Sequence, residues 1–134
     1  MALQALYQMD VRKKWGPELR DVFGIVGEKA PEDVKDFYTR LTVGVVAHKQ
    51  DIDCLIEKYS EHWKIARMPI VDRNILRLAI FELQHCPEIP AKVSINEAVE
   101  LGRRYNCTES AFFINALLDR IARQELNRDP EREP

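Results

Sequence analysis

The chain has 134 residues, of which 46% are hydrophobic and 31% charged, and its formal net charge is −2 at pH 7. This composition excludes a disordered chain and a strongly basic nucleic-acid-binding protein, so any contact with nucleic acid must rest on a local patch. No apolar run approaches the roughly 20 residues that span a bilayer, and no signal peptide opens the sequence, so we expect one cytoplasmic domain.

Helical periodicity begins almost at the first residue. The segment ALQALYQMDV places Leu3, Leu6 and Tyr7 on one face of a helix. A short second helix is expected over about Glu18–Val26, because it follows Gly-Pro and ends near a glycine. Glycine and proline fall between periodic segments throughout the chain, which predicts an all-α, single-domain bundle of six or seven helices.

The middle of the chain predicts a long helix followed by a core helix. The long one starts at Pro31 and keeps its apolar period to about Tyr59, and Gly44 inside it indicates close packing of another helix. A turn or short helix is expected around Trp63–Arg67. The densely apolar segment after it predicts the central core helix, which buries Ile75, Leu76, Ala79, Ile80 and Leu83.

Two further helices and a tail complete the prediction. In PAKVSINEAVELGRRY, Ser94 and Glu97 have the spacing of a capping box. The last helix is expected to begin near Thr108, which would serve as its N-cap. The predicted domain covers residues 1–126, and the polar segment 127–134 is expected to be disordered.

Catalytic and metal-binding patterns are missing from the sequence. His48, His62 and His85 are far apart and have no ligand spacing, and there is no phosphate-binding glycine loop or nucleophile elbow. The three cysteines lie far apart, so we interpret them as buried or half-buried free thiols. We therefore expect no catalytic residues, no metal and no cofactor, and a protein that is not an enzyme.

The remaining candidates are on surfaces. Arg73 and Arg77 lie one turn apart on the core helix and should share an outer face. Arg104 closes a helix, where a cation interacts favourably with the C-terminal dipole. Phe112 and Phe113 are adjacent, so either a wide face buries both rings or one of them is partly exposed for a base or a partner.

Several ordered blocks of the chain resemble one family. ALQALYQMD, VDRNILRLAIFEL, IPAKVSINEAVELGRRY and FFINALLDRIA are similar to the NusB transcription antitermination factors, in the same order and over nearly the whole chain. The resemblance implies an all-helical bundle that pairs with the ribosomal protein NusE. It also implies binding to boxA RNA of nascent ribosomal RNA transcripts, and thereby an indirect role in the RNA polymerase antitermination complex.

The resemblance also implies a partner surface. The family's NusE-binding tyrosine and the acid that opens its core helix fall here on Tyr7 and Asp72. We assign Arg73 and Arg77 to the same surface. For Tyr7, burial as a core aromatic is equally compatible with the pattern, and for Asp72 the alternative is an acid stabilised by the helix dipole.

The RNA-binding residues that the resemblance implies lie at the start of the last helix. They map onto Glu109 and Phe113, with Tyr105 and Arg104 close by in the sequence. Family members usually carry an arginine run before the first helix, whereas this sequence opens with MALQALY. Either the sequence starts late or the partner supplies the phosphate contacts; we favour the first and expect weak RNA binding without NusE.

Two other functions remain open. One is a detached NusB-like RNA-binding module of a ribosomal RNA methyltransferase system, although 134 residues leave no room for an α/β cofactor domain. The other is a helical homodimer that masks its binding face around Tyr7 or Phe113.

Overall fold

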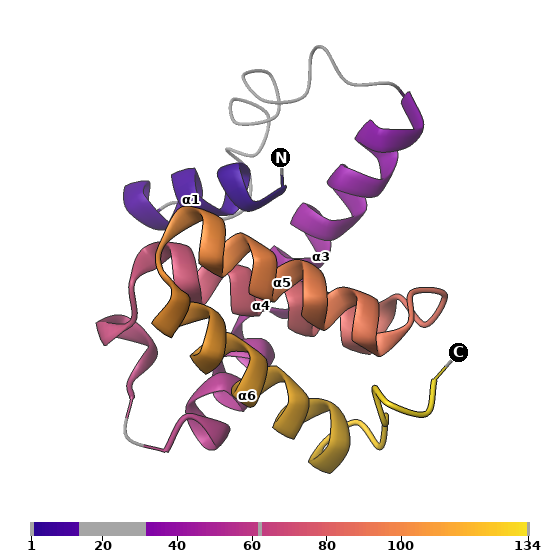
Figure 1. The fold of residues 1–134 in the computed structure, drawn as a ribbon. Coiled ribbons are helices and arrows are strands. Elements are labelled where there is room, and N and C mark those ends of the chain that lie inside the picture. Colours follow the sequence, from indigo (N-terminus) through magenta and orange to yellow (C-terminus); the bar gives the residue numbers. More distant parts are fainter. Residues whose placement is uncertain (1, 14–31, 62, 134) are drawn as a thin grey trace.

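The computed structural model describes residues 2–13, 32–61 and 63–133, and these residues form no strand (Figure 1). The elements are α1 (Ala2–Arg12), α3 (Glu32–Tyr59), the 3-10 turn η1 (Ile65–Arg67), α4 (Ile70–His85), α5 (Ala91–Tyr105) and α6 (Thr108–Gln124). The all-α prediction is confirmed. The described ranges hold five α-helices rather than six or seven, and the helix expected at Glu18–Val26 lies outside them.

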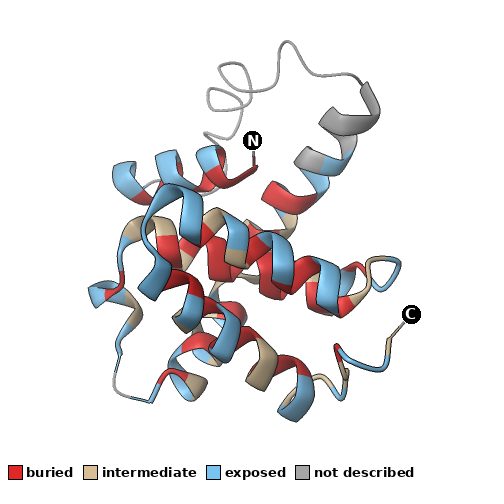
Figure 2. Cartoon of the chain, in the orientation of Figure 1, coloured by how far each residue is buried: buried red, intermediate tan, exposed pale blue. Residues whose placement is uncertain are grey.

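Helix α4 lies at the centre of the bundle. It packs against α1, α3, α5 and α6, and the buried residues of these helices face one another around it (Figure 2). Ile75, Leu76 and Ile80 on α4 are completely buried. The prediction that this segment is the core helix is therefore confirmed.

Gly44 lets α4 approach α3 closely. A Cβ added at Gly44 would lie 2.1 Å from Cζ of Phe81, which is far inside van der Waals contact. The absence of a side chain in the middle of α3 thus makes room for an aromatic ring of the core helix, as the sequence predicts.

A proline precedes both α4 and α5, and in α5 it takes the place of the expected serine cap. Pro69 and Pro90 occupy the N-cap positions of α4 and α5, with φ of −53° and −57° that already match a helix. The capping-box prediction is wrong, because Ser94 is the fourth residue of α5 and is buried. Thr108 is the first residue of α6, and Cys107 takes the N-cap position.

The segment 127–133, expected to be disordered, is hydrogen-bonded to the body of the protein. The Arg128 guanidinium donates to the carbonyls of Leu83 at 2.7 Å and Ile89 at 3.0 Å, and it also pairs with Glu133. Pro130 is buried. Because these contacts join residues about forty positions apart, local composition does not reveal them.

Two remaining expectations concern membranes and thiols. None of the helices in the described ranges has the length and apolar character needed to cross a membrane. Cys86 is buried as expected, but Cys54 and Cys107 are exposed.

Candidate functional site

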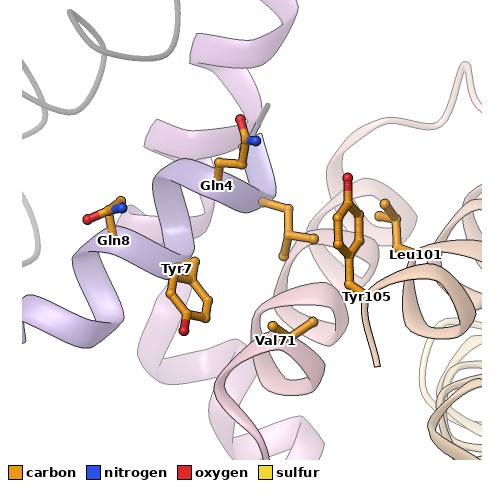
Figure 3. A pocket seen from close by; sticks show the side chains of 7 residues that line it. Gln4, Tyr7, Gln8, Val71, Leu101 and Tyr105 are labelled. Carbon is orange, nitrogen blue, oxygen red and sulfur yellow. The ribbon is translucent and has the colours of Figure 1, made fainter. Parts of the chain in front are cut away.

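A hollow of about 220 Å³ opens between α1, α4 and α5. Tyr7 on α1 and Tyr105 at the end of α5 stand on its two sides, and Val71 of α4 lies between them (Figure 3). Both rings are substantially exposed, Tyr7 at 38% and Tyr105 at 54%. The structure thus places on one hollow two tyrosines that the sequence assigned to different surfaces. Its lining is completed by Leu3, Gln4, Gln8 and Leu101.

The amphipathic pattern of α1 explains why Tyr7 faces outward. Leu3, Leu6 and Met9 are buried against the bundle, and they occupy the inner face of the helix. Tyr7 therefore lies at the edge of that face, with its ring on the hollow. Tyr7 is therefore not a buried aromatic residue of the core, which was one of the two interpretations of its position in the sequence.

A second hollow, of about 340 Å³, lies beside the turn between α5 and α6. Asp72, in the first turn of α4, is only 4% exposed in this hollow. Its carboxylate accepts hydrogen bonds from Nδ2 of Asn106 at 3.1 Å and from Oγ of Ser110 at 2.9 Å. Asp72 thus ties the start of the core helix to the α5–α6 turn. Glu109 lines the same hollow and is exposed.

The two phenylalanines of α6 differ in exposure. Phe112 is 72% exposed, whereas Phe113 packs partly against the core and lines the second hollow with Trp63. The alternative with one partly exposed ring is therefore confirmed. The more exposed ring is, however, Phe112 and not the Phe113 that the resemblance singles out.

The arginine pair at the end of α5 is exposed. Arg103 forms an ion pair with Glu100, with 2.8 Å between Nη1 and Oε2. Among the described residues, Arg104 has no ion-pair partner, so its guanidinium is the one available for an anion. It directly precedes Tyr105, which lines the first hollow, but Arg104 is not itself one of the lining residues.

Arg73 and Arg77 do not share an outer face, and that expectation is wrong. Arg77 is 3% exposed and Arg73 is largely covered, because both guanidiniums reach inward to Asp10 on α1. Nε of Arg73 lies 2.7 Å from Asp10 Oδ2, and Nη1 of Arg77 lies 2.8 Å from the same oxygen. In the sequence, Arg73 and Arg77 resemble an exposed charged face because they lie one turn apart. Their partner, Asp10, is more than sixty residues away, so the sequence does not reveal the pairing.

Asp10 belongs to a buried polar cluster that the sequence analysis missed. Asn74 Nδ2 donates to Asp10 at 2.8 Å, and Arg77 also donates through Nε to Oδ1 of Asp53 on α3 at 2.8 Å. Burial alone would raise the pKa of Asp10. The hydrogen bonds from Arg73 and Asn74 and the positive charges of Arg77 and Arg73 outweigh burial and hold that pKa below its ordinary value. The available signal was an acid on the apolar face of α1, since Asp10 follows Leu6 by four residues.

The described residues contain no group of three or more histidine, cysteine, aspartate or glutamate side chains placed to hold a metal ion. His48 and His85 are stacked, with 4.4 Å between ring centroids, at the far end of α4 from the hollows. His62 lies outside the described residues.

Comparison with known sequences gives one consistent match. The model of the NusB family matches residues 1–123. The transcription antitermination protein NusB of Myxococcus xanthus is 47% identical over 125 residues, which cover 90% of this chain and 89% of that protein. The NusB of Desulforapulum autotrophicum is 46% identical over 122 residues, covering 90% of this chain and 85% of that protein.

Solved structures resemble the chain over almost its full length. The structure of T. maritima NusB has a TM-score of 0.85 at 35% identity and covers 97% of this chain and 89% of that chain. A chain in the structure of antitermination factors NusB and NusE in complex with dsRNA has a TM-score of 0.78 at 29% identity, covering 91% and 90%.

Proposed function

This chain belongs to the NusB family, and from that membership we propose that it is a transcription antitermination factor. It acts as a non-catalytic adaptor that pairs with ribosomal protein NusE and binds boxA RNA of nascent ribosomal RNA transcripts. It reaches the RNA polymerase antitermination complex indirectly through these contacts, in the cytoplasm. A relative of the same fold is described in complex with NusE and dsRNA, which supports this proposal.

The observation that carries the proposal is the hollow between α1, α4 and α5. An apolar hollow flanked by two exposed tyrosines is a typical protein-binding feature, because aromatic side chains gain much from burial and lose little entropy. Tyr7 is the partner contact on α1. We propose that Asp72, Arg73 and Arg77 support this surface indirectly, since their charged groups are engaged inside the protein.

The RNA surface continues from the end of α5 to the start of α6. Arg104 supplies a cation for phosphate, and Tyr105 and Phe113 supply rings on which bases can stack. The carboxylate of Glu109 repels phosphate, so its role is to accept a hydrogen bond from a base amino group. One unpaired cation and one acid make this surface weak for RNA alone, which favours joint binding with NusE.

Calorimetric titration tests the proposal. We expect the folded protein to bind NusE, and boxA RNA to bind tightly only when NusE is present. Tyr7→Ala should weaken NusE binding by at least about tenfold, since exposed aromatic anchors dominate interfaces. Val93→Ala is the matched control, because Val93 is an exposed apolar residue at the opposite end of α5 from Tyr105.

Folded wild-type protein that does not bind NusE would overturn the adaptor function. Sedimentation of the free protein, run in parallel, separates that result from self-association. A stable dimer that loses NusE binding would place a second copy on this hollow instead.

A further inference from the structure

The carboxylate of Asp10 is the meeting point of three donors from α4. Nε of Arg73, Nδ2 of Asn74 and Nη1 of Arg77 approach Oδ2 at 2.7, 2.8 and 2.8 Å, and Arg73 also engages Oδ1 through Nη2. Asp10 is buried. One acid on α1 thus anchors that helix to three residues of the core helix that lie within about one turn.

These bonds supply a kind of restraint that the apolar contacts of α1 lack. Leu6 and Met9 bury the inner face of α1, but apolar packing depends on the area removed from water and only weakly on direction. Charged hydrogen bonds in a buried site are directional, and buried polar groups can select one arrangement among several of similar packing. Asp10 therefore fixes the rotation and the axial register of α1.

Tyr7 lies one turn before Asp10 on α1, so both side chains follow the same rotation of the helix. A small rotation of α1 would move the Tyr7 ring away from Val71 and Tyr105 and change the shape of the hollow. The anchor and the exposed ring are therefore mechanically coupled, although Asp10 itself is covered and cannot touch a partner.

We propose that Asp10 is a positioning residue for partner binding, which orients α1 through Arg73, Asn74 and Arg77 so that Tyr7 lines the hollow. The inference rests on the proposed binding of NusE at this surface. It gives a role to Arg73 and Arg77, which support the partner surface through Asp10 without forming part of it.

The same cluster supplies a matched control. Arg77 also donates to Asp53 on α3, through Nε at 2.8 Å and Nη2 at 3.1 Å. Asp53→Asn weakens the cluster at its other end and leaves the bonds between Asp10 and α4 in place. Asp10→Asn and Asp53→Asn each remove one charge next to the same guanidinium, but only the first acts on the helix that carries Tyr7.

The test is a double-mutant cycle read by NusE affinity. Asp10→Asn should weaken NusE binding by about tenfold, within the roughly two- to hundredfold range of coupled neighbours, whereas Asp53→Asn should change it less than about twofold. In the Tyr7→Ala background the effect of Asp10→Asn on NusE affinity should disappear. An additive cycle, or equal loss in both aspartate variants, would assign Asp10 to general stability and overturn the inference.

A second measurement does not depend on the partner. Hydrogen exchange of the α1 amides should accelerate in Asp10→Asn and remain unchanged in Asp53→Asn, with α6 as the internal reference. If Asp10→Asn does not fold, Arg73→Lys replaces it, because lysine keeps the charge but loses the two-pronged contact with Asp10. Wild-type protein that fails to bind NusE would remove the proposed function, while unchanged α1 exchange in the variants would remove the positioning role.

Discussion

The Ser110 hydroxyl donates a 2.9 Å hydrogen bond to the Asp72 carboxylate, which joins the first turn of α6 to the first turn of α4. Val71, which directly precedes Asp72 in α4, lines the hollow between α1 and α5. The next residue, Arg73, reaches Asp10 on α1. At the start of the core helix, Val71 and Asp72 thus line one hollow each, and Arg73 joins the same turn to α1.

Removal of the Ser110 hydroxyl should destabilise the protein. Ser110→Ala leaves one oxygen of a buried carboxylate without its partner, so we expect the free energy of unfolding to fall by about 1–3 kcal/mol. Asn106→Ala removes the other donor from a more exposed side chain and should cost less. Urea unfolding of both variants measures the difference, and equal stability of Ser110→Ala and wild type would contradict the role assigned to the bond.

Acid should weaken the anchor at Asp10. Burial opposes ionisation of this group, but its bonds to Arg73 and Asn74 and the charges of Arg77 and Arg73 prevail, so its pKa in the folded protein lies below the ordinary 3.8. Between the folded pKa and the ordinary value, the carboxyl group therefore binds fewer protons in the folded state than in the unfolded state. The stabilisation is complete above about pH 5 and is lost as the pH falls below 3.8 through the folded pKa.

A variant without this titration isolates the effect. Asp10→Asn cannot ionise, so its stability should fall less steeply than that of wild type between about pH 4 and pH 2. Urea midpoints at a series of pH values measure both slopes, and the other carboxyl groups contribute equally to each. Parallel curves would mean that the Asp10 carboxyl is not stabilised in its charged form.

Local patterns in the sequence predicted the helices but not the contacts between their polar groups. Apolar periodicity identified α3 and α4, and Gly44 correctly indicated close packing, since both signals are local. The pairing of Asp10 with Arg77 joins positions 67 apart, and no spacing rule within one helix can reveal it. Arg77, which is buried, and Arg73, which is largely covered, were therefore assigned to the surface.

The site was predicted in outline only. Tyr7 and Tyr105 were selected for different partners, and the fold alone brings them to one hollow. Phe113 was chosen over Phe112 by resemblance, because two adjacent rings cannot be ranked by exposure until the packing of α6 is known. The start of α5 was predicted wrongly for a local reason, because Pro90, and not Ser94, occupies the N-cap position of that helix.

Gly44→Ala should destabilise the protein even though alanine is the better helix former. The new methyl group would meet the Phe81 ring, so we expect a loss of about 1–3 kcal/mol instead of the gain of about 1 kcal/mol that propensity alone predicts. Thermal unfolding gives the sign. The double variant with Phe81→Leu should recover part of the loss, and a stabilised single variant would show that α3 and α4 can separate at little cost.

The two rings of α6 can be separated by leucine substitution. Phe113→Leu keeps an apolar side chain against the core but removes the aromatic ring. If a base stacks on this ring, the free energy of RNA binding in the presence of NusE should weaken by about 1–3 kcal/mol. Phe112→Leu is the control and should leave stability within about 0.5 kcal/mol, because that ring is exposed. If only Phe112→Leu lowers RNA affinity, the stacking ring is the more exposed one.

Arg104 should contribute to RNA binding through charge alone. Arg104 is exposed at the end of α5, so Arg104→Ala should lower RNA affinity and reduce the slope of log affinity against log salt by about 1. Arg123→Ala is the matched control, since Arg123 is an exposed arginine in the last turn of α6 that already pairs with Asp119. Fluorescence anisotropy with labelled boxA RNA and saturating NusE measures both slopes. An unchanged slope for Arg104→Ala would move the phosphate contacts away from the end of α5, because a cation that neutralises a phosphate must release a counterion from the RNA.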